Sequence, residues 1–170
     1  MIGPTGMDGL TIRLAKPSDQ SELRRAVVEL QEHERRLHAT RLPGEAIADA
    51  YLAWILAQAA ERGAVFVAES PNAFAGFAAG WIEDEANIAE TRDSTRFGLV
   101  SDICVLAPYR GRRIASSLLE ALETLFLRDG VSRIRIGALA SNAAARASYE
   151  RSGFAPYEVV YEKLIGPAGG

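Results

Sequence analysis

The chain has 170 residues, of which 48% are hydrophobic and 24% are charged, and its formal net charge is −3 at pH 7. This composition is typical of a globular protein large enough for a substantial core. The small negative charge gives no general attraction to nucleic acid or acidic lipid. Cys104 is the only cysteine, which excludes an intrachain disulfide and a cysteine-based zinc site. We expect one domain over residues 1–170, with an ordered core at about 10–165 and loose Gly-rich ends.

The sequence contains no segment typical of a membrane or secreted protein. The longest apolar run, Ala50–Ala57, is far shorter than the roughly 18 residues of a membrane span. The N-terminus lacks the basic region and apolar core of a secretory signal. With a single cysteine, these features predict a cytoplasmic protein without a membrane partner.

The first part of the chain predicts one strand followed by two helices. Residues 10–14 alternate between apolar and polar side chains, as a half-buried strand does. A turn precedes a helix from about Gln20, and the far end of this helix, residues 32–36, is strongly charged. Pro43 suits the first turn of a second helix, and Gly63 ends it.

The rest of the chain predicts strands interrupted by two further helices. The predicted strands are residues 64–69, 74–83, 99–106 and 132–137, with a final strand pair at about 154–164. One predicted helix begins at Arg112, and a second spans residues 142–152. The order is β-α-α-β-β-β-α-β-α-β-β. It predicts an α/β fold of the α+β type, with a mixed sheet and helices on both faces.

A basic turn, Tyr109–Arg113, joins the strand at 99–106 to the next helix. The first N–H groups of a helix have no partner within the helix and carry partial positive charge. The turn can direct its own N–H groups to the same place, and Arg110, Arg112 and Arg113 add charge and donors. The pattern predicts a phosphate or pyrophosphate site at a helix N-terminus. The alternative is an ordinary corner with solvated arginines, and neither the Walker loop nor the dinucleotide fingerprint fits.

Two motifs resemble those of the GCN5-related N-acetyltransferase (GNAT) family. Residues 110–115, Arg-Gly-Arg-Arg-Ile-Ala, resemble its acyl-coenzyme A loop, Gln/Arg-x-x-Gly-x-Gly/Ala, with Arg113 in place of the inner glycine. Residues 142–154 resemble its Asn-x-x-Ala-x-x-x-Tyr-x-x-x-Gly-Phe element. The resemblance covers roughly residues 10–164. It implies a mostly antiparallel sheet of six to seven strands and acetyl-coenzyme A (acetyl-CoA) as co-substrate.

The resemblance also implies the residues that hold the coenzyme. Arg110 and the backbone N–H groups of Gly111, Arg113 and Ala115 would hold the pyrophosphate. The strand at 99–106, opened by a bulge in this family, would pair with the pantetheine arm, and a freed N–H near Cys104 or Val105 would bind the oxyanion. The full implied set is Ile103, Cys104, Val105, Arg110, Gly111, Arg112, Arg113, Ile114, Ala115, Asn142 and Tyr149.

Four polar residues are candidates for roles in catalysis or coenzyme binding, and each also has a structural alternative. Tyr149 matches the family's general acid, and its alternative is packing against the last strand. Asn142 matches a coenzyme contact, and it or Ser141 can also cap its helix. Asp102 and Glu83 are candidates for the general base, directly or through a water, although either carboxylate can instead serve a structural role.

The remaining polar residues point to no other chemistry. Cys104 is expected to be a small buried residue rather than a nucleophile, because no histidine supports it. His33 and His38 lack partners spaced for a metal, so no metal is expected.

The expected function is acetyl transfer from acetyl-CoA to a primary amine of a small molecule or peptide. The acidic residues Glu32 and Glu34, with those at 83–85, are compatible with a cationic acceptor. The alternative is a catalytically silent acyl-CoA-binding sensor or interaction domain, which Arg113 favours. A nucleic-acid-binding module is disfavoured by the negative net charge. A homodimer is an expectation from the family.

Overall fold

The computed structural model describes residues 9–71 and 73–166. The loose ends predicted at residues 1–9 and 166–170 therefore fall almost entirely outside the described residues.

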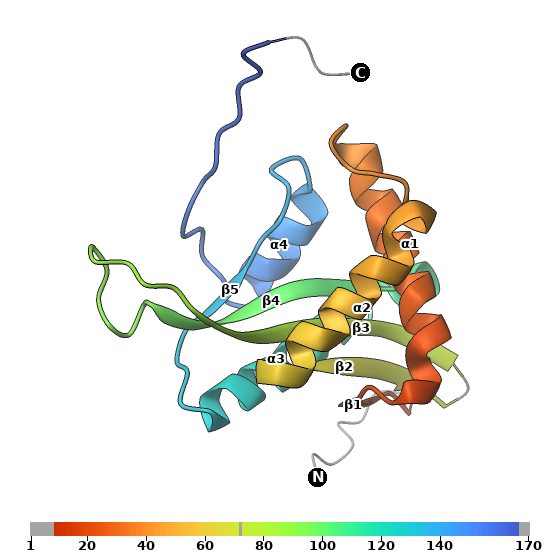
Figure 1. Ribbon diagram of the computed structural model, residues 1–170. Helices are drawn as coiled ribbons and strands as arrows, with labels where there is room; N and C mark the ends of the chain where they lie inside the picture. The colour runs from red at the N-terminus through yellow and green to blue at the C-terminus, as the bar shows by residue number, and fades with distance from the viewer. Residues whose placement is uncertain (1–8, 72, 167–170) are drawn as a thin grey trace.

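One sheet of five strands forms the centre of the protein (Figure 1). The strands follow their sequence order: β1 (Thr11–Leu14), β2 (Gly63–Ser70), β3 (Ala73–Asp84), β4 (Arg96–Val105) and β5 (Ile134–Ile136). The first four are antiparallel, and β5 runs parallel to β4. This arrangement confirms the mixed, mostly antiparallel sheet.

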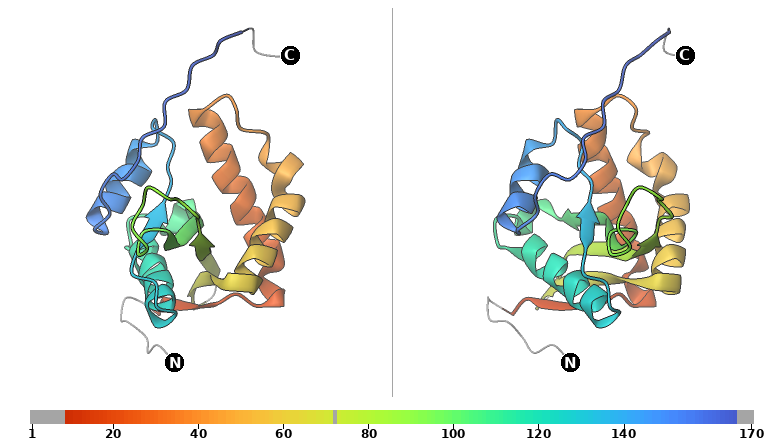
Figure 2. Two further views of the ribbon diagram at one scale, coloured as in Figure 1. Left: turned by 60° about the vertical axis from the view of Figure 1, so that its left-hand side comes forward. Right: turned by 90° about the vertical axis from the view of Figure 1, so that its left-hand side faces the viewer.

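Helices cover both faces of the sheet, as Figure 2 shows. The helices are α1 (Gln20–Leu37), α2 (Gly44–Arg62), α3 (Ile114–Arg128) and α4 (Ala143–Arg151). Helices α1 and α2 lie on one side, where the buried cluster includes Leu23, Ile55 and Phe77. Helix α3 lies on the other side, where the cluster includes Leu118 and Phe126. None of the described helices combines the length and apolar character needed to cross a bilayer.

The contact between α3 and the sheet requires a glycine at position 98. A Cβ on Gly98 would lie 2.2 Å from Cδ2 of Phe126, and the Phe126 side chain is almost fully buried. Because no carbon contact is that short, the missing side chain allows α3 to pack directly on β4.

A β-bulge in β4 changes which face its side chains occupy. Ala79 pairs with Asp102 and Gly80 pairs with Val100, so Ser101 is an extra residue in the ladder. Positions 100 and 102 would share one face of a regular strand. Instead, Val100 belongs to the α3-side cluster, whereas Asp102 bonds to α2. The bulge confirms the opening that the family resemblance implied for this strand.

The same bulge marks the point where β4 and β5 part. Strand β5 pairs only with residues 98–100 of β4. No strand pairs with residues 101–105 on that side in the described part of the chain. The last half of β4 therefore has one edge free.

The predicted final strand pair at 154–164 is wrong, and the sheet has five strands rather than six or seven. Residues 154–165 form an extended segment that leads away from the body of the protein (Figure 1). Alternating apolar side chains favour extended backbone, but a strand needs a neighbour that accepts its hydrogen bonds. Only the start of this segment touches the sheet, where Tyr157 meets Arg135 of β5.

Candidate functional site

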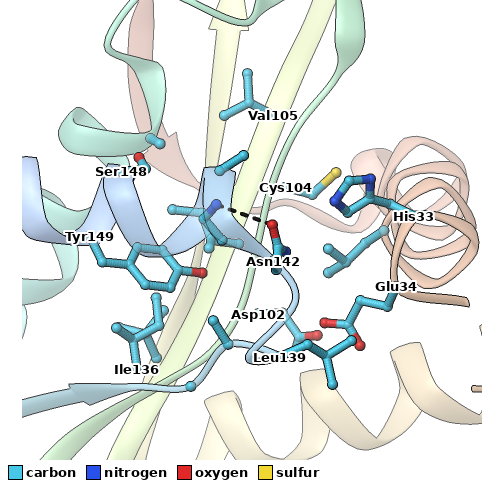
Figure 3. Close-up of a pocket in the computed structure, with 18 of the residues that line it drawn as sticks. His33, Glu34, Asp102, Cys104, Val105, Ile136, Leu139, Asn142, Ser148 and Tyr149 are labelled. Carbon is cyan, nitrogen blue, oxygen red and sulfur yellow. Dashed lines mark hydrogen bonds between the residues drawn. The ribbon is translucent and has the colours of Figure 1, made fainter. Parts of the chain in front are cut away.

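A cleft of about 1120 Å³ opens where β4 and β5 part. Its floor is the free half of β4. One wall is α1 with residues 40–42 of the α1–α2 connection and part of α2, and the other is the loop after β5 with α4 (Figure 3). The turn at residues 109–116 closes one end. The cleft thus joins the two motifs that are far apart in sequence.

The turn before α3 presents unpaired backbone donors. Within the described part of the chain, the N–H groups of residues 111–116 have no hydrogen-bond acceptor, and no side chain caps α3. Gly111 has φ +77° and Arg113 has φ +58°. Two left-handed residues separated by one other residue alternate the direction of the chain, as in an anion-binding nest. Donors at a helix N-terminus fit a phosphate group.

Arg113, at the position where the family motif has a glycine, adopts a left-handed backbone conformation, which glycine reaches without strain. Among the described residues, it is the one residue other than glycine with a positive φ. A left-handed conformation strains a residue that carries a Cβ, and here it also delays the start of the helix, which begins at Ile114 rather than Arg112. The arginine at this position is therefore compatible with a loop conformation that glycine favours.

The three arginines of the turn have different surroundings. Arg110 donates from Nε to the Val105 carbonyl oxygen at 2.9 Å and forms an ion pair with Glu29 of α1 at 3.0 Å. Arg112 does not line the cleft, and its guanidinium lies 5.8 Å from the centre of the Tyr109 ring. Of the predicted loop residues, the structure brings Arg110, Gly111, Arg113, Ile114 and Ala115 to the cleft and leaves Arg112 outside its lining.

The predicted strand residues Ile103, Cys104 and Val105 line the cleft as a row on β4. Cys104 is buried, and desolvation raises the pKa of its thiol to about 12. The thiol is therefore neutral at physiological pH and a poor nucleophile, which agrees with its expected packing role.

Asp102 is a buried carboxylate with two hydroxyl partners. It is 6% exposed; Tyr51 of α2 donates to it at 3.1 Å and Ser101 at 2.6 Å. Burial raises the pKa of Asp102, and the two hydrogen bonds partly oppose that rise. The pKa of Tyr51 is also raised, first by burial and then by the charge of Asp102. Such a carboxylate binds a proton more readily than one in water.

Tyr149 points its hydroxyl into the cleft from α4 (Figure 3). Its ring packs against Phe154, with 6.1 Å between ring centres. Burial raises the pKa of Tyr149 to about 12, and the charges of Glu34 and Asp102 contribute. The hydroxyl is therefore protonated at neutral pH and available as a donor.

Asn142 begins the helix that carries Tyr149. Its Oδ1 accepts a hydrogen bond from the Ala145 N–H at 3.1 Å, which confirms the expected capping role. The same side chain lines the cleft (Figure 3), so capping leaves it in reach of a bound molecule.

The structure does not bring Glu83 to the cleft. It lies opposite Phe97 near the end of β3, and its Oε1 accepts from Trp81 Nε1 at 2.6 Å. The acidic group that joins Asp102 in the cleft is Glu34 of α1 (Figure 3), which pairs with Arg41 at 2.7 Å.

Tyr51 is the residue that sequence reasoning missed. It belongs to the apolar stripe of α2, and its ring does stack on Trp54 with 5.5 Å between ring centres. Helical spacing marks such a residue as part of the core, and only the position of α2 against Asp102 reveals the second role of its hydroxyl.

Comparison with known proteins identifies the family. Residues 25–154 match the acetyltransferase (GNAT) family. Since this match includes both motifs and most of the chain, the protein belongs to the GNAT family.

One curated relative is the uncharacterised N-acetyltransferase YycN of Bacillus subtilis (strain 168). It is 31% identical over 77 residues, which are 45% of this chain and 49% of that protein. The chain thus spans about half the length of the curated relative that it matches.

Solved structures share the fold. The aminoglycoside N-acetyltransferase AAC(6')-Iy in complex with coenzyme A has a TM-score of 0.69 at 20% identity, over 97% of this chain and all of that one. A GCN5-related N-acetyltransferase from Ralstonia eutropha JMP134 has a TM-score of 0.70 at 20% identity, over 93% and 100% of the two chains. A predicted acetyltransferase with acetyl-CoA from Clostridium acetobutylicum has a TM-score of 0.68 at 19% identity, over 92% and 96%.

Proposed function

We propose that this protein transfers the acetyl group of acetyl-CoA to a primary amine of a small molecule or peptide. The observation that carries the proposal is one cleft shared by the unpaired N–H groups of Gly111 and residues 113–116, the buried carboxylate of Asp102 and the hydroxyl of Tyr149. Family membership and solved relatives with coenzyme A or acetyl-CoA bound support the same co-substrate.

The described residues fit the coenzyme. The N–H groups of Gly111 and residues 113–116 would bind the pyrophosphate, with Arg113 and Arg110 adding charge. The free edge of β4 would pair with the amide groups of the pantetheine arm, as an added strand does. Acetyl-CoA supplies an activated thioester, and residues of the chain supply the oxyanion donor, the general base and the general acid.

The oxyanion donor that we assign is the N–H of Val105. The Leu106 N–H donates to Ala75 of β3 at 2.9 Å. Because alternate N–H groups of a strand point in opposite directions, the N–H of Val105 is directed to the free edge. A backbone donor fixed in place stabilises negative charge that develops on the acetyl oxygen.

Asp102 is the general base in this proposal, directly or through a water. An alkyl amine with a pKa of ~10.4 is neutral in only about one molecule in 2,500 at pH 7, so removal of its proton contributes to the rate. The raised pKa of Asp102 makes it a stronger base than an ordinary carboxylate. Tyr51 and Ser101 hold the carboxylate in position.

Tyr149 is the general acid in this proposal. From the neutral amine, the reaction forms a C–N bond, breaks the C–S bond and moves one proton from nitrogen to sulfur. The proton that Asp102 takes from the ammonium form of the acceptor is released to solvent. The protonated hydroxyl of Tyr149 would donate to the sulfur as its charge builds.

The proposal is tested by the release of coenzyme A thiol with a panel of amines. Tyr149→Phe should lower kcat at least ~10-fold and leave the KM for acetyl-CoA nearly unchanged, since a positioned acid contributes ~10²–10⁴ in rate. Tyr161→Phe removes a hydroxyl from an exposed position and should match the wild type. An equal loss of coenzyme affinity and rate in Tyr149→Phe would argue against the acid role.

A catalytically silent acyl-CoA-binding protein is the alternative that Arg113 suggests. The left-handed φ of Arg113 is one that glycine adopts without strain, so the loop conformation is compatible with coenzyme binding in either case. The presence of Asp102 and Tyr149 in the same cleft supports catalysis over the silent alternative. Saturable binding of acetyl-CoA without thiol release across the amine panel would favour the silent protein. We place the protein in the cytoplasm, where a single buried thiol such as Cys104 remains reduced.

A further inference from the structure

We propose that the acceptor is a small primary amine with a single positive charge and an apolar body, and that the ion pair between Glu34 and Arg41 sets this preference. The preference rests on the proposed function and is a property of the acceptor wall, by which we mean the residues between 27 and 51 that line the cleft.

The acceptor reaches Asp102 along the acceptor wall. The turn at residues 109–116 and the free edge of β4 are assigned to the coenzyme, which leaves this wall and the loop after β5 to the acceptor. Tyr51 of α2 donates to Asp102 at 3.1 Å. Burial raises the pKa of Asp102, and the charge of Glu34 on α1 adds to that rise. Leu139 lines the cleft from the loop after β5 (Figure 3). An amine at Asp102 therefore lies between the acceptor wall and this loop.

The cleft offers an ammonium group one carboxylate that is not already paired with a cation. Among the described residues that line it, Glu34 and Asp102 are the acidic ones. Arg41 donates from Nε to Oε2 of Glu34 at 2.7 Å, whereas the partners of Asp102 are the neutral hydroxyls of Tyr51 and Ser101. The ammonium group of the acceptor therefore pairs with Asp102, and a second ammonium group would lose its water without gaining an ionic partner.

Other polar side chains of the acceptor wall also bond within the protein. Gln31 donates from Nε2 to the Leu42 carbonyl oxygen at 2.9 Å, and Thr40 Oγ1 lies 2.8 Å from Nδ1 of His38. His33 lines the cleft without a hydrogen bond to the other residues drawn in Figure 3, and one imidazole can serve few polar groups. An acceptor rich in hydroxyl or amino groups would thus find few partners, and each unpaired polar group that it buried would weaken its binding.

Apolar side chains supply the rest of the surface around the acceptor. Leu42 and Leu139 line the cleft, and neither belongs to a core cluster among the described residues, so packing within the core does not occupy them. Leu42 is 61% exposed. Leu30 and Ile47 line the same wall and are partly buried. An apolar body on the acceptor would remove these surfaces from water, and each buried CH₂ group would favour binding ~4-fold.

The test measures the release of coenzyme A thiol with a series of unbranched amines from ethylamine to pentylamine. We expect kcat/KM to rise ~3–4-fold with each added CH₂ group. The compounds 1,5-diaminopentane and 5-aminopentanoate have the chain length of pentylamine and carry a second charge. Each should have a kcat/KM at least ~10-fold below that of pentylamine, because Glu34 and Arg41 are already paired with each other and leave the second charge without a partner.

Failure of the substrate class and failure of the proposed function give different results in this assay. A kcat/KM that does not change with chain length, or that is as high for either doubly charged compound as for pentylamine, would overturn the substrate class and leave acetyl transfer intact. No thiol release with any amine, despite binding of acetyl-CoA, would overturn the proposed function and the substrate class with it.

Arg41→Gln frees the Glu34 carboxylate, and Arg36→Gln is the matched control. Arg36 is an exposed residue of the last turn of α1 that does not line the cleft, so its loss removes an equal charge and leaves Glu34 paired. The ratio of kcat/KM for 1,5-diaminopentane to that for pentylamine should rise ~5-fold in Arg41→Gln and stay within ~2-fold of the wild type in Arg36→Gln. A purely structural role would affect both amines equally, so an unchanged ratio in Arg41→Gln would overturn the role of the ion pair.

Leu139→Asn tests the apolar surface, with Leu127→Asn as its control. Leu139→Asn should lower kcat/KM for pentylamine at least ~5-fold and leave that for ethylamine within ~2-fold, because only the longer amine reaches the altered surface. Leu127 is an exposed residue of α3 outside the cleft lining, and its replacement should leave both values unchanged. An equal loss for the two amines in Leu139→Asn would overturn the apolar contact with the acceptor.

Discussion

Replacement of Arg113 by glycine should stabilise the protein, although it removes a residue from the proposed binding loop. Arg113 has φ +58°, a conformation that costs a residue with a Cβ ~1–2 kcal/mol. Glycine avoids that strain, but its greater freedom in the unfolded chain costs ~0.5–1 kcal/mol. The midpoints of these two ranges give a net gain of about 0.75 kcal/mol, which for a chain of this length raises Tm by about 1.5–3 °C.

Arg112→Gly is the matched control. It removes the same charge from the adjacent position, but Arg112 is not among the residues with positive φ. This variant therefore carries the entropic cost of glycine without relief of strain, and its Tm should equal or fall below that of the wild type. Thermal unfolding followed by circular dichroism measures all three proteins. If Arg113→Gly melts no higher than Arg112→Gly, the argument from backbone strain is refuted.

Two further variants test the packing of α3 and the state of Asp102. Gly98→Ala should lower the free energy of unfolding by ~1–3 kcal/mol, because its Cβ would overlap Phe126. The control is Gly137→Ala, whose Cβ meets nothing within 4 Å. Equal Tm values for the two variants would contradict the contact between Gly98 and Phe126. Burial raises the pKa of Asp102 above its unfolded value of ~3.9, so the folded state binds the proton of Asp102 more tightly than the unfolded state does. The contribution of Asp102 to the free energy of unfolding is therefore full at low pH and is lost as pH rises through the folded pKa. Asp102→Asn should remove this decline in urea unfolding from pH 3 to 8, and the acid limb of kcat/KM should disappear with it; an unchanged pH slope of stability would contradict the assignment.

The sequence predicted the elements that local chemistry determines. The basic turn and the helix after it follow from adjacent residues, and the structure places them as predicted, with α3 starting two residues later because Arg113 is left-handed. Asn142 caps α4 as its residue type favours. Such features depend on interactions within a few residues, which a sequence displays directly.

Features that depend on distant partners could not be predicted in the same way. Nothing in the sequence marks Ser101 as a bulge residue, yet the bulge turns Asp102 toward Tyr51. Glu83 and Asp102 were equal candidates by residue type, and only the tertiary structure separates them by placing Glu83 beside Trp81. The alternating segment at 154–164 has the composition of strands but no neighbouring strand in its own chain.

The central claim is that the N–H groups of Gly111 and residues 113–116 hold the pyrophosphate of acetyl-CoA, so that its thioester lies near Asp102 and Tyr149. Calorimetric titration tests it most directly, with acetyl-CoA, acetyl-4′-phosphopantetheine and acetyl-pantetheine compared. Acetyl-4′-phosphopantetheine keeps the phosphate nearest the pantetheine arm, and acetyl-pantetheine lacks the pyrophosphate and the nucleoside attached to it. We predict saturable binding of one acetyl-CoA per chain, and binding of acetyl-pantetheine at least ~10-fold weaker than that of acetyl-4′-phosphopantetheine, since charge-assisted hydrogen bonds contribute ~1.5–3 kcal/mol each. No heat of binding at millimolar acetyl-CoA, or equal affinity for the two pantetheine compounds, would contradict the claim.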